Sequence, residues 1–411
     1  MVDLNKIFNK ISENSIFSNK FILQTSYTPE SIPHREKQIE QVASILAPAL
    51  RGDRTSNLFI YGQPGTGKTL STCYVKNEMQ KKADKEHIPL RIEYLNCKMR
   101  KVSDTEYRIF AELIKKLGGS VPSTGLPTDQ IYNKFIELIE NEQKLIILVL
   151  DEIDQAVKKI SDNFLYNLTR LNSELSKAQI NIVGISNDLK FLDSLDPRVR
   201  SSLGEEEVVF SPYNAVQLQE ILKERAEQAF NAGVLEEGVI AKCSAFAARE
   251  HGDARRALDL LRVAGELAER EGSKKVKIAH VDLANEKMDK DKIIDVIENA
   301  PKQFQIVMLS IILLNQKDKK LFTGEVYNLY RDICAKCKTE VLTQRRIGDL
   351  ITEIDMLGLA NAPVISKGRY GRTRDISLSI PEKIIEKAKS ILSEKLDINL
   401  DFKIGKKIID Y

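Results

Sequence analysis

The fold of this chain is decided by the stretch Gly62-Gln63-Pro64-Gly65-Thr66-Gly67-Lys68-Thr69. It follows an apolar run at 58–61 and opens a helical pattern at about 69–82. A strand, a glycine-rich loop and a helix in this order are the context that a phosphate-binding loop requires. The glycines let successive backbone N–H groups converge on one point, and the helix N-terminus adds partial positive charge there. The sequence therefore predicts a site for a nucleoside triphosphate.

Polar side chains in and beyond this stretch supply the chemistry that such a site needs. Lys68 brings a full positive charge to the β- and γ-phosphates, and the Thr69 hydroxyl can bind Mg²⁺. Asp151 and Glu152 end an apolar run at 145–150, and Asn187 ends another at 182–186. Strand ends of this kind face the ligand in parallel sheets. Asp151 is therefore expected to hold the Mg²⁺ shell and Glu152 to orient or deprotonate an attacking water.

These polar residues also have structural explanations. Asp151 and Glu152 could be a helix-capping acidic pair, but the phosphate-binding loop upstream favours the functional interpretation. Asn187 could hydrogen-bond to the attacking water or to the γ-phosphate, yet asparagine is also common in turns. Two pairs of arginines follow, and guanidinium groups suit the negative charge that develops on a phosphoryl group. Taken alone, each arginine is better explained as a surface salt-bridge residue; the pairs are Arg198 with Arg200 and Arg255 with Arg256.

The first half of the chain alternates apolar strands with helical segments, which predicts a parallel α/β sheet covered on both faces. The predicted strands are residues 57–61, 90–96, 145–150, 180–186 and 206–210. After residue 210 the pattern becomes helical, with predicted helices at 215–232, 237–250, 254–270 and 278–288. We also expect an insertion or long loop at 118–130, where glycine and proline break the pattern, and a polar linker at 285–292.

A third domain is predicted to be a winged helix. Three helical patterns at 302–315, 324–338 and 344–357 precede two short β runs at 359–366 and 373–379. The third helix has Thr343 as its N-cap, Gly358 just beyond its end, and one apolar stripe. That stripe consists of Ile347, Leu350, Ile351 and Ile354. The predicted domains are thus a nucleotide-binding α/β domain at 1–210, an all-helical domain at 211–290, a winged helix at 291–395 and a tail at 396–411.

Positive charge gathers in the winged helix. Lys367, Arg369, Arg372 and Arg374 surround one turn, whose glycines allow close approach to a phosphate backbone. The start of the third helix is where a recognition helix contacts base edges or phosphates. A solvated basic hairpin is the alternative. The predicted DNA contacts are Thr343, Gln344, Arg345, Arg346, Lys367, Gly368, Arg369, Tyr370, Gly371, Arg372 and Thr373.

Composition bounds the remaining possibilities. The chain has 411 residues, 42% hydrophobic and 29% charged, which suits a soluble protein of two or three domains. No apolar run is long enough to span a membrane. The N-terminus lacks a signal-peptide pattern, so a cytoplasmic location is expected. Five scattered cysteines argue against a disulfide framework.

The order of these motifs resembles the AAA+ ATPases, and more closely the archaeal origin-recognition and cell-division-cycle initiator family, over residues 27–389. The most specific likeness is a lid that carries Gly252-Asp253-Ala254-Arg255-Arg256 combined with a C-terminal winged helix. The resemblance implies an AAA+ phosphate-loop domain, an all-helical lid and a winged-helix domain. It also implies an ATP-dependent origin-binding replication initiator with slow ATPase activity.

The resemblance also implies roles for individual residues. Arg255 would read the γ-phosphate from the lid, and Arg198 or Arg200 would act on the ATP of a neighbouring subunit. The insertion at 118–130 resembles a second contact to DNA. The residues expected to bind ATP or ADP are Pro33, Pro64, Gly65, Thr66, Gly67, Lys68, Thr69, Leu70, Asp151, Tyr213 and Arg255, and those expected to hold Mg²⁺ are Thr69 and Asp151.

The resemblance finally implies partners. These are double-stranded origin DNA, the replicative helicase and related initiator subunits in a homo- or hetero-oligomer; no membrane partner is expected. Two other functions remain open: a DNA-bound repressor of replication or transcription, and a clamp-loader-like ATPase. The winged helix argues against a clamp loader, which ends in a helical collar, but nothing in the sequence separates an initiator from a repressor.

Overall fold

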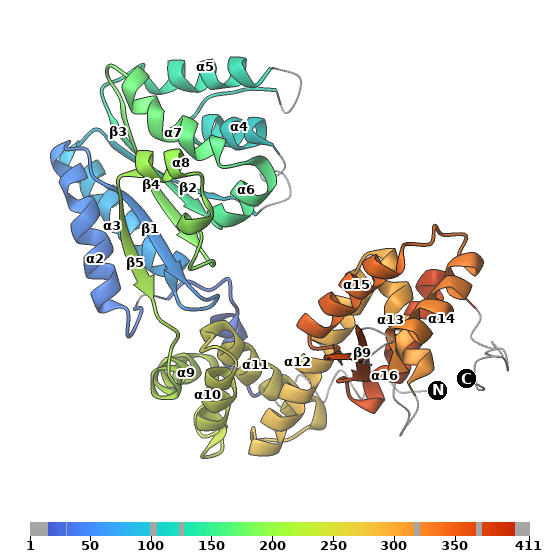
Figure 1. The fold of residues 1–411 in the computed structure, drawn as a ribbon. Helices are drawn as coiled ribbons and strands as arrows, with labels where there is room; N and C mark the ends of the chain where they lie inside the picture. Colours follow the sequence, from blue (N-terminus) through green and yellow to red (C-terminus); the bar gives the residue numbers. More distant parts are fainter. Residues whose placement is uncertain are drawn as a thin grey trace. The chain divides into compact units, whose positions relative to one another are not determined.

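The computed structural model describes residues 15–29, 31–98, 105–122, 127–315, 321–366 and 372–398. The chain forms two compact units, residues 1–281 and 282–411 (Figure 1). No helix in the described ranges is both long and apolar enough to cross a bilayer.

The first unit is built on the predicted parallel sheet, and all five predicted strands are confirmed. Its spatial order is β2-β3-β4-β1-β5, and every neighbouring pair is parallel. This order brings the ends of β1, β3 and β4 to the same edge of the sheet. The strands are β1 (Asn57–Gly62), β2 (Leu90–Asn96), β3 (Leu145–Asp151), β4 (Gln179–Ser186) and β5 (Glu205–Phe210).

Side-chain alternation along the strands divides the core of this sheet into two layers. Leu58 and Ile60 pack with α2 (Glu36–Leu46) and α3 (Lys68–Glu86) on one face, while Phe59 and Tyr61 pack into the opposite cluster. Figure 1 shows α2 and α3 on one side of the sheet and the helices after β2 on the other. These other helices are α4 (Glu106–Lys116), α5 (Thr128–Ile139), α6 (Ile153–Ile160), α7 (Asn163–Glu174) and α8 (Pro197–Leu203).

The predicted insertion at 118–130 is in part a connection between two helices. It links α4 to α5, and α5 already begins at Thr128. Residues 123–126 lie outside the described ranges. Three short 3-10 helices complete the α/β part and its N-terminal segment; they are Lys20–Leu23, Ala47–Arg51 and Leu192–Ser194.

The helical lid carries part of the N-terminus. Phe17 pairs with Phe230 at a ring-centroid distance of 4.7 Å, and Lys20 forms a 2.6 Å ion pair with Glu266. These contacts join the N-terminal segment to the lid, although residues 1–210 are predicted from the sequence to form one domain. The lid helices are α9 (Ala215–Ala229), α10 (Val239–Arg249) and α11 (Ala254–Glu271).

The prediction of a polar linker at 285–292 is wrong. These residues lie inside one continuous helix, α12 (Ile278–Asn299), which was predicted to end at 288. The stretch is polar, but it contains neither glycine nor proline, and its three lysines, one glutamate and one methionine favour helices. Polarity alone therefore did not break the helix.

The second unit has the predicted winged-helix arrangement. The apolar stripe of α15 is buried, the Thr343 hydroxyl accepts a hydrogen bond from the Arg346 N–H at 3.4 Å, and Gly358 has a φ of 70°. Strand β9 pairs antiparallel with β6, β7 and β8. The elements are α13 (Lys302–Leu314), β6 (Leu321–Phe322), α14 (Thr323–Lys336), α15 (Gln344–Met356), β7 (Ala360–Asn361), β8 (Val364–Ser366), β9 (Arg372–Leu378) and α16 (Glu382–Leu396).

A close contact inside the sheet of the first unit generates a stability prediction. A Cβ on Gly184 of β4 would lie 2.5 Å from a ring carbon of Phe59, which is itself fully buried. We expect Gly184→Ala to lower the free energy of unfolding of this unit by about 1–3 kcal/mol, the usual cost of overpacking a core. Chemical denaturation followed by circular dichroism measures the change.

The control is Gly324→Ala in α14, where no described atom beyond the neighbouring residues and the backbone of the same helix lies within 4 Å of the added methyl group. This variant should unfold like the parent or become slightly more stable. Equal stability of the Gly184→Ala variant and the parent would contradict the packing analysis.

Candidate nucleotide site

The phosphate loop leads from β1 into α3, and it lies directly against the lid. Gly65 has a φ of 73°, and a Cβ there would lie 1.7 Å from a carboxylate oxygen of Asp253. The Ala254 N–H, at the start of α11, donates a hydrogen bond to the Gly65 carbonyl at 3.2 Å. Only glycine fits between the loop and the lid at this point.

Lys68 is the buried cation of the site. Its side chain is at the first position of α3, and the residue is only 5% exposed. Its ammonium donates to the Gly62 carbonyl at 2.7 Å, the Gln63 carbonyl at 2.9 Å and the Asn187 side-chain oxygen at 2.8 Å. The structure thus brings Asn187, from the end of β4, next to Lys68.

Burial lowers the pKa of the Lys68 ammonium to about 8. Asp151 raises this pKa, and the positive charge of Arg255 lowers it further. A bound phosphate would add negative charge beside the ammonium and favour its protonated form.

Asp151 and Thr69 are also brought together. The Thr69 hydroxyl donates to one carboxylate oxygen of Asp151 at 2.9 Å, and the Tyr94 hydroxyl donates to the same oxygen at 2.7 Å. The other oxygen accepts the Glu152 N–H at 2.9 Å. A buried carboxylate beside a hydroxyl is the oxygen-donor chemistry that Mg²⁺ takes in nucleotide sites.

Glu152 lies at the mouth of the same site. Its carboxylate forms a 3.2 Å ion pair with the largely exposed Lys98. Sequence reasoning missed Lys98 and Tyr94, and it gave Asp253 no contact with the loop. No motif marks Lys98 or Tyr94, because only the pairing of β2 with β3 places them here. Asp253 does belong to the lid motif, but the motif does not show that the lid packs against the loop.

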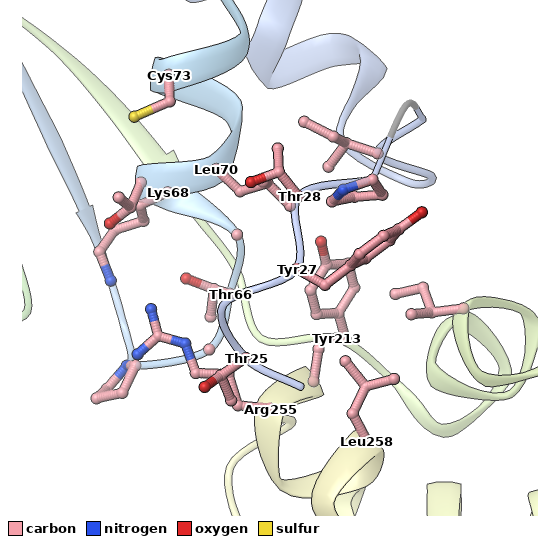
Figure 2. Close-up of a pocket in the computed structure, with 18 of the residues that line it drawn as sticks. Thr25, Tyr27, Thr28, Thr66, Lys68, Leu70, Cys73, Tyr213, Arg255 and Leu258 are labelled. Atoms are coloured by element: carbon pink, nitrogen blue, oxygen red, sulfur yellow. The ribbon is translucent and has the colours of Figure 1, made fainter. Parts of the chain in front are cut away.

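Arg255 reaches the site from the lid. It stands at the start of α11, where the Asp253 carboxylate caps the helix by accepting its backbone N–H at 2.8 Å. Figure 2 shows Lys68 and Arg255 on α3 and α11, with Tyr27, Tyr213 and Leu258 in the other half of the pocket. The two cations therefore converge on the phosphate loop from different elements.

A cavity of about 550 Å³ is lined by all of the residues that were expected to bind the nucleotide. Its phosphate end is lined by the loop and by Asp151, Glu152, Asn187 and Arg255. Its other end is formed by the N-terminal segment, the lid and the hinge between β5 and α9. The lining residues of that end include Tyr27, Ile32, Pro33, Leu70, Tyr213, Ile221 and Leu258.

The structure does not bring Arg198 and Arg200 to this cavity. Both lie on α8 and neither is among the described residues that line it. Arg198 pairs with Asp196 at 3.0 Å and Arg200 with Asp193 at 2.9 Å, and both arginine side chains are exposed.

The predicted DNA contacts divide into two groups. Thr343, Gln344, Arg345 and Arg346 are exposed at the start of α15. Lys367, Gly368, Arg369, Tyr370 and Gly371 lie outside the described residues, Arg372 begins β9, and Thr373 pairs with Ile365. Arg374, expected with the charges of the turn, instead donates to the Ala362 carbonyl at 2.9 Å and the Thr352 hydroxyl at 2.7 Å.

The lowered pKa of Lys68 predicts a pH dependence of nucleotide affinity. Below about pH 7 the ammonium is charged in the free protein, so its protonation does not change on binding. Above about pH 8 the free protein has lost this proton, and binding must restore it. We therefore expect the affinity for ADP to fall, by up to about tenfold per pH unit, between pH 8 and 9.5.

Titration calorimetry across this range measures the effect, and Lys68→Arg is the control because guanidinium does not titrate there. The residual affinity of that variant should be flat with pH. Parallel slopes for the parent and the variant would show that another group is responsible.

Comparisons with known proteins agree on one family. Three family models match, an AAA ATPase domain at 31–183, a Cdc6 AAA+ ATPase-type lid domain at 219–286 and a CDC6 C-terminal winged-helix domain at 295–388. The ORC1-type DNA replication protein of Pyrococcus abyssi is 52% identical over 388 residues, 93% of this chain and 92% of that protein. ORC1-type DNA replication protein 1 of Methanosarcina mazei is 50% identical over 97% of this chain and 96% of that protein.

The structure of the Aeropyrum pernix ORC1 protein in complex with DNA matches with a TM-score of 0.82. It is 41% identical, over 92% of this chain and 97% of that chain. The predicted resemblance is confirmed: this chain belongs to the family of ORC1-type DNA replication proteins.

Proposed function

We propose that this chain is an ATP-dependent replication initiator that binds double-stranded origin DNA and helps to recruit or load the replicative helicase. One observation carries the proposal. The same chain has a cavity lined by the phosphate loop and the polar residues around it in its first unit, and a winged helix in its second unit. The relative from Aeropyrum pernix, whose structure contains DNA, shares both parts. An initiator of this kind acts on the chromosome and therefore in the cytoplasm.

The geometry supports a role for each residue in ATP chemistry. The Lys68 ammonium would exchange its carbonyl partners for the β- and γ-phosphates, with Asn187 beside it. Thr69 and Asp151 would hold Mg²⁺, which neutralises phosphate charge when bound. Glu152 would orient the attacking water, and Arg255 would sense the γ-phosphate from the lid. Pro33 and Tyr213 would contact the base.

Arg198 and Arg200 support an assembly of several subunits. Both are exposed on α8 and sit outside the cavity of their own chain, so they are available to a neighbouring subunit. We propose that one of them completes the ATP site of that neighbour when related initiators assemble on DNA. Slow hydrolysis by the isolated chain follows, because an arginine supplied by a partner is worth about 10³–10⁵ in rate.

DNA recognition is assigned to the second unit. The exposed start of α15, with Arg345 and Arg346, would contact base edges or phosphates, and the turn at 367–373 would follow the backbone. The connection between α4 and α5 would supply the second contact, from the first unit.

The hydrolysis roles predict a contrast between residues that act in their own site and residues that act in a neighbour's. Glu152→Gln should keep nucleotide binding, lose hydrolysis and remain inactive when mixed with Lys68→Ala protein. The Arg198→Ala/Arg200→Ala double variant should regain activity in the same mixture, because the Lys68→Ala partner cannot use ATP but retains both arginines. Phosphate release at high protein concentration on DNA measures both mixtures. Absence of rescue in the second would argue against action between subunits.

The DNA assignment is the test of the proposed function. Arg369→Ala/Arg372→Ala should weaken duplex binding and flatten the plot of log affinity against log salt concentration by about 0.9 for each lost phosphate contact. Arg345→Ala should instead relax sequence preference if it contacts a base, by about 1–3 kcal/mol. Fluorescence anisotropy with origin and scrambled duplexes over a salt series gives both quantities, and ADP binding serves as the control for folding. Unchanged DNA affinity and salt slope in the wing variant would contradict a contact by the turn.

A further inference from the structure

Arg35 is a buried cation that the proposed roles do not use. It lies immediately before α2, is 3% exposed, and has its guanidinium in a pocket of carbonyl oxygens and aromatic rings. The Nε atom donates to the Thr66 carbonyl at 2.8 Å, and one terminal nitrogen donates to the Ser211 carbonyl at 2.6 Å. The guanidinium carbon also lies 3.7 Å from the centre of the Tyr213 ring.

This environment is costly for an arginine whose only purpose is packing. Burial lowers the pKa of the guanidinium, an effect that Tyr213 and the charge of Glu36 only partly offset. An apolar side chain in such a pocket often stabilises a fold as well as a buried charge does. The guanidinium also donates to the carbonyl of the adjacent His34 at 3.2 Å, but its two acceptors from other parts of the chain, Thr66 and Ser211, are the informative feature.

The first carbonyl belongs to the phosphate loop. The Thr66 C=O and the Gly67 N–H are parts of one planar trans peptide, so they point in opposite directions. A hydrogen bond that fixes the oxygen toward Arg35 therefore also fixes the N–H away from it. The Thr66 hydroxyl restrains the same residue by donating to the Gln63 carbonyl at 2.8 Å.

The second carbonyl belongs to the hinge of the lid. Ser211 follows β5, and two residues later the Tyr213 N–H donates to the Gly252 carbonyl at 3.3 Å. A Cβ on Gly252 would lie 2.3 Å from the Tyr213 carbonyl oxygen, so hinge and lid are in close contact. Gly252 directly precedes the Asp253 cap and Arg255 of α11.

We propose that Arg35 is a positioning residue that ties the phosphate loop to the lid hinge, and thereby sets where Arg255 stands over the phosphates. The inference rests on the proposed nucleotide function. Lysine cannot replace arginine here, because one ammonium lacks the planar fork that reaches two separate carbonyls while stacking on a ring.

The test is a double-mutant cycle on nucleotide affinity. The variants are Arg35→Lys, Arg255→Ala and the combination, measured by calorimetry with ADP and with a non-hydrolysable ATP analogue. We expect Arg35→Lys to weaken binding of both nucleotides about tenfold and to remove most of the effect of Arg255→Ala on the ATP analogue. The control is Arg262→Lys on α11, because the Arg262 guanidinium forms ion pairs with Asp259 and Glu266 of the same helix. This variant should bind nucleotide like the parent.

Amide hydrogen exchange of the nucleotide-free protein supplies a second measurement. Arg35→Lys should speed exchange in peptides that cover 63–67 and 211–213 together, without a general increase over the unit. If Arg35→Lys does not fold, Arg35→Gln is measured in the same way. The inference would be overturned if the effects of Arg35→Lys and Arg255→Ala on affinity were additive and if amide exchange became faster throughout the unit or did not change. Arg35 would then be a structural residue. Failure of the parent to bind either nucleotide would instead overturn the proposed function together with the inference.

Discussion

The Lys68 ammonium, held among two backbone carbonyls and the Asn187 amide, is the interaction on which the nucleotide site depends. Its partners come from the end of β1, from the phosphate loop and from the end of β4. They meet only because β1 and β4 are neighbours in the parallel sheet. Three neutral oxygens accept the three N–H groups of this buried ammonium, and a phosphate can replace them as acceptors, so the fold positions the cation before a ligand arrives.

The lid takes part in the site through its backbone as well as through Arg255. The Ala254 N–H binds the Gly65 carbonyl, and Asp253 occupies the space that a side chain at Gly65 would need. The first turn of α11 and the phosphate loop therefore cannot move far apart without losing these contacts. A nucleotide that moves the phosphate loop would therefore also move the start of α11. The proposed role of Arg35 adds a second connection, from the loop to the hinge of the lid.

Sequence alone predicted the parts of the molecule whose signal is local. The strands were found because parallel strands buried on both faces are continuous apolar runs, and α15 because its stripe, cap and terminal glycine coincide. Tyr94 could not be found in this way, since a half-buried tyrosine in a strand is ordinary. Only the register that pairs Asn96 with Asp151 brings its hydroxyl to that carboxylate. Arg35 was missed for a related reason: its acceptors are backbone carbonyls, which every residue has.

The partners of each arginine in the fold are a better guide to candidate DNA contacts than the number of positive charges along the sequence. Arg374 satisfies its guanidinium inside the second unit, between Ala362 and Thr352 of α15, and so helps to fix β9 to that helix. Arg346 instead pairs with the exposed Asp349 at 3.7 Å. An exposed pair of this kind is worth about 1 kcal/mol or less, so exchanging the carboxylate for a DNA phosphate costs little. The same residue type therefore holds the wing in place at one position and forms only a weak, exposed pair at the other, where we propose that it contacts DNA.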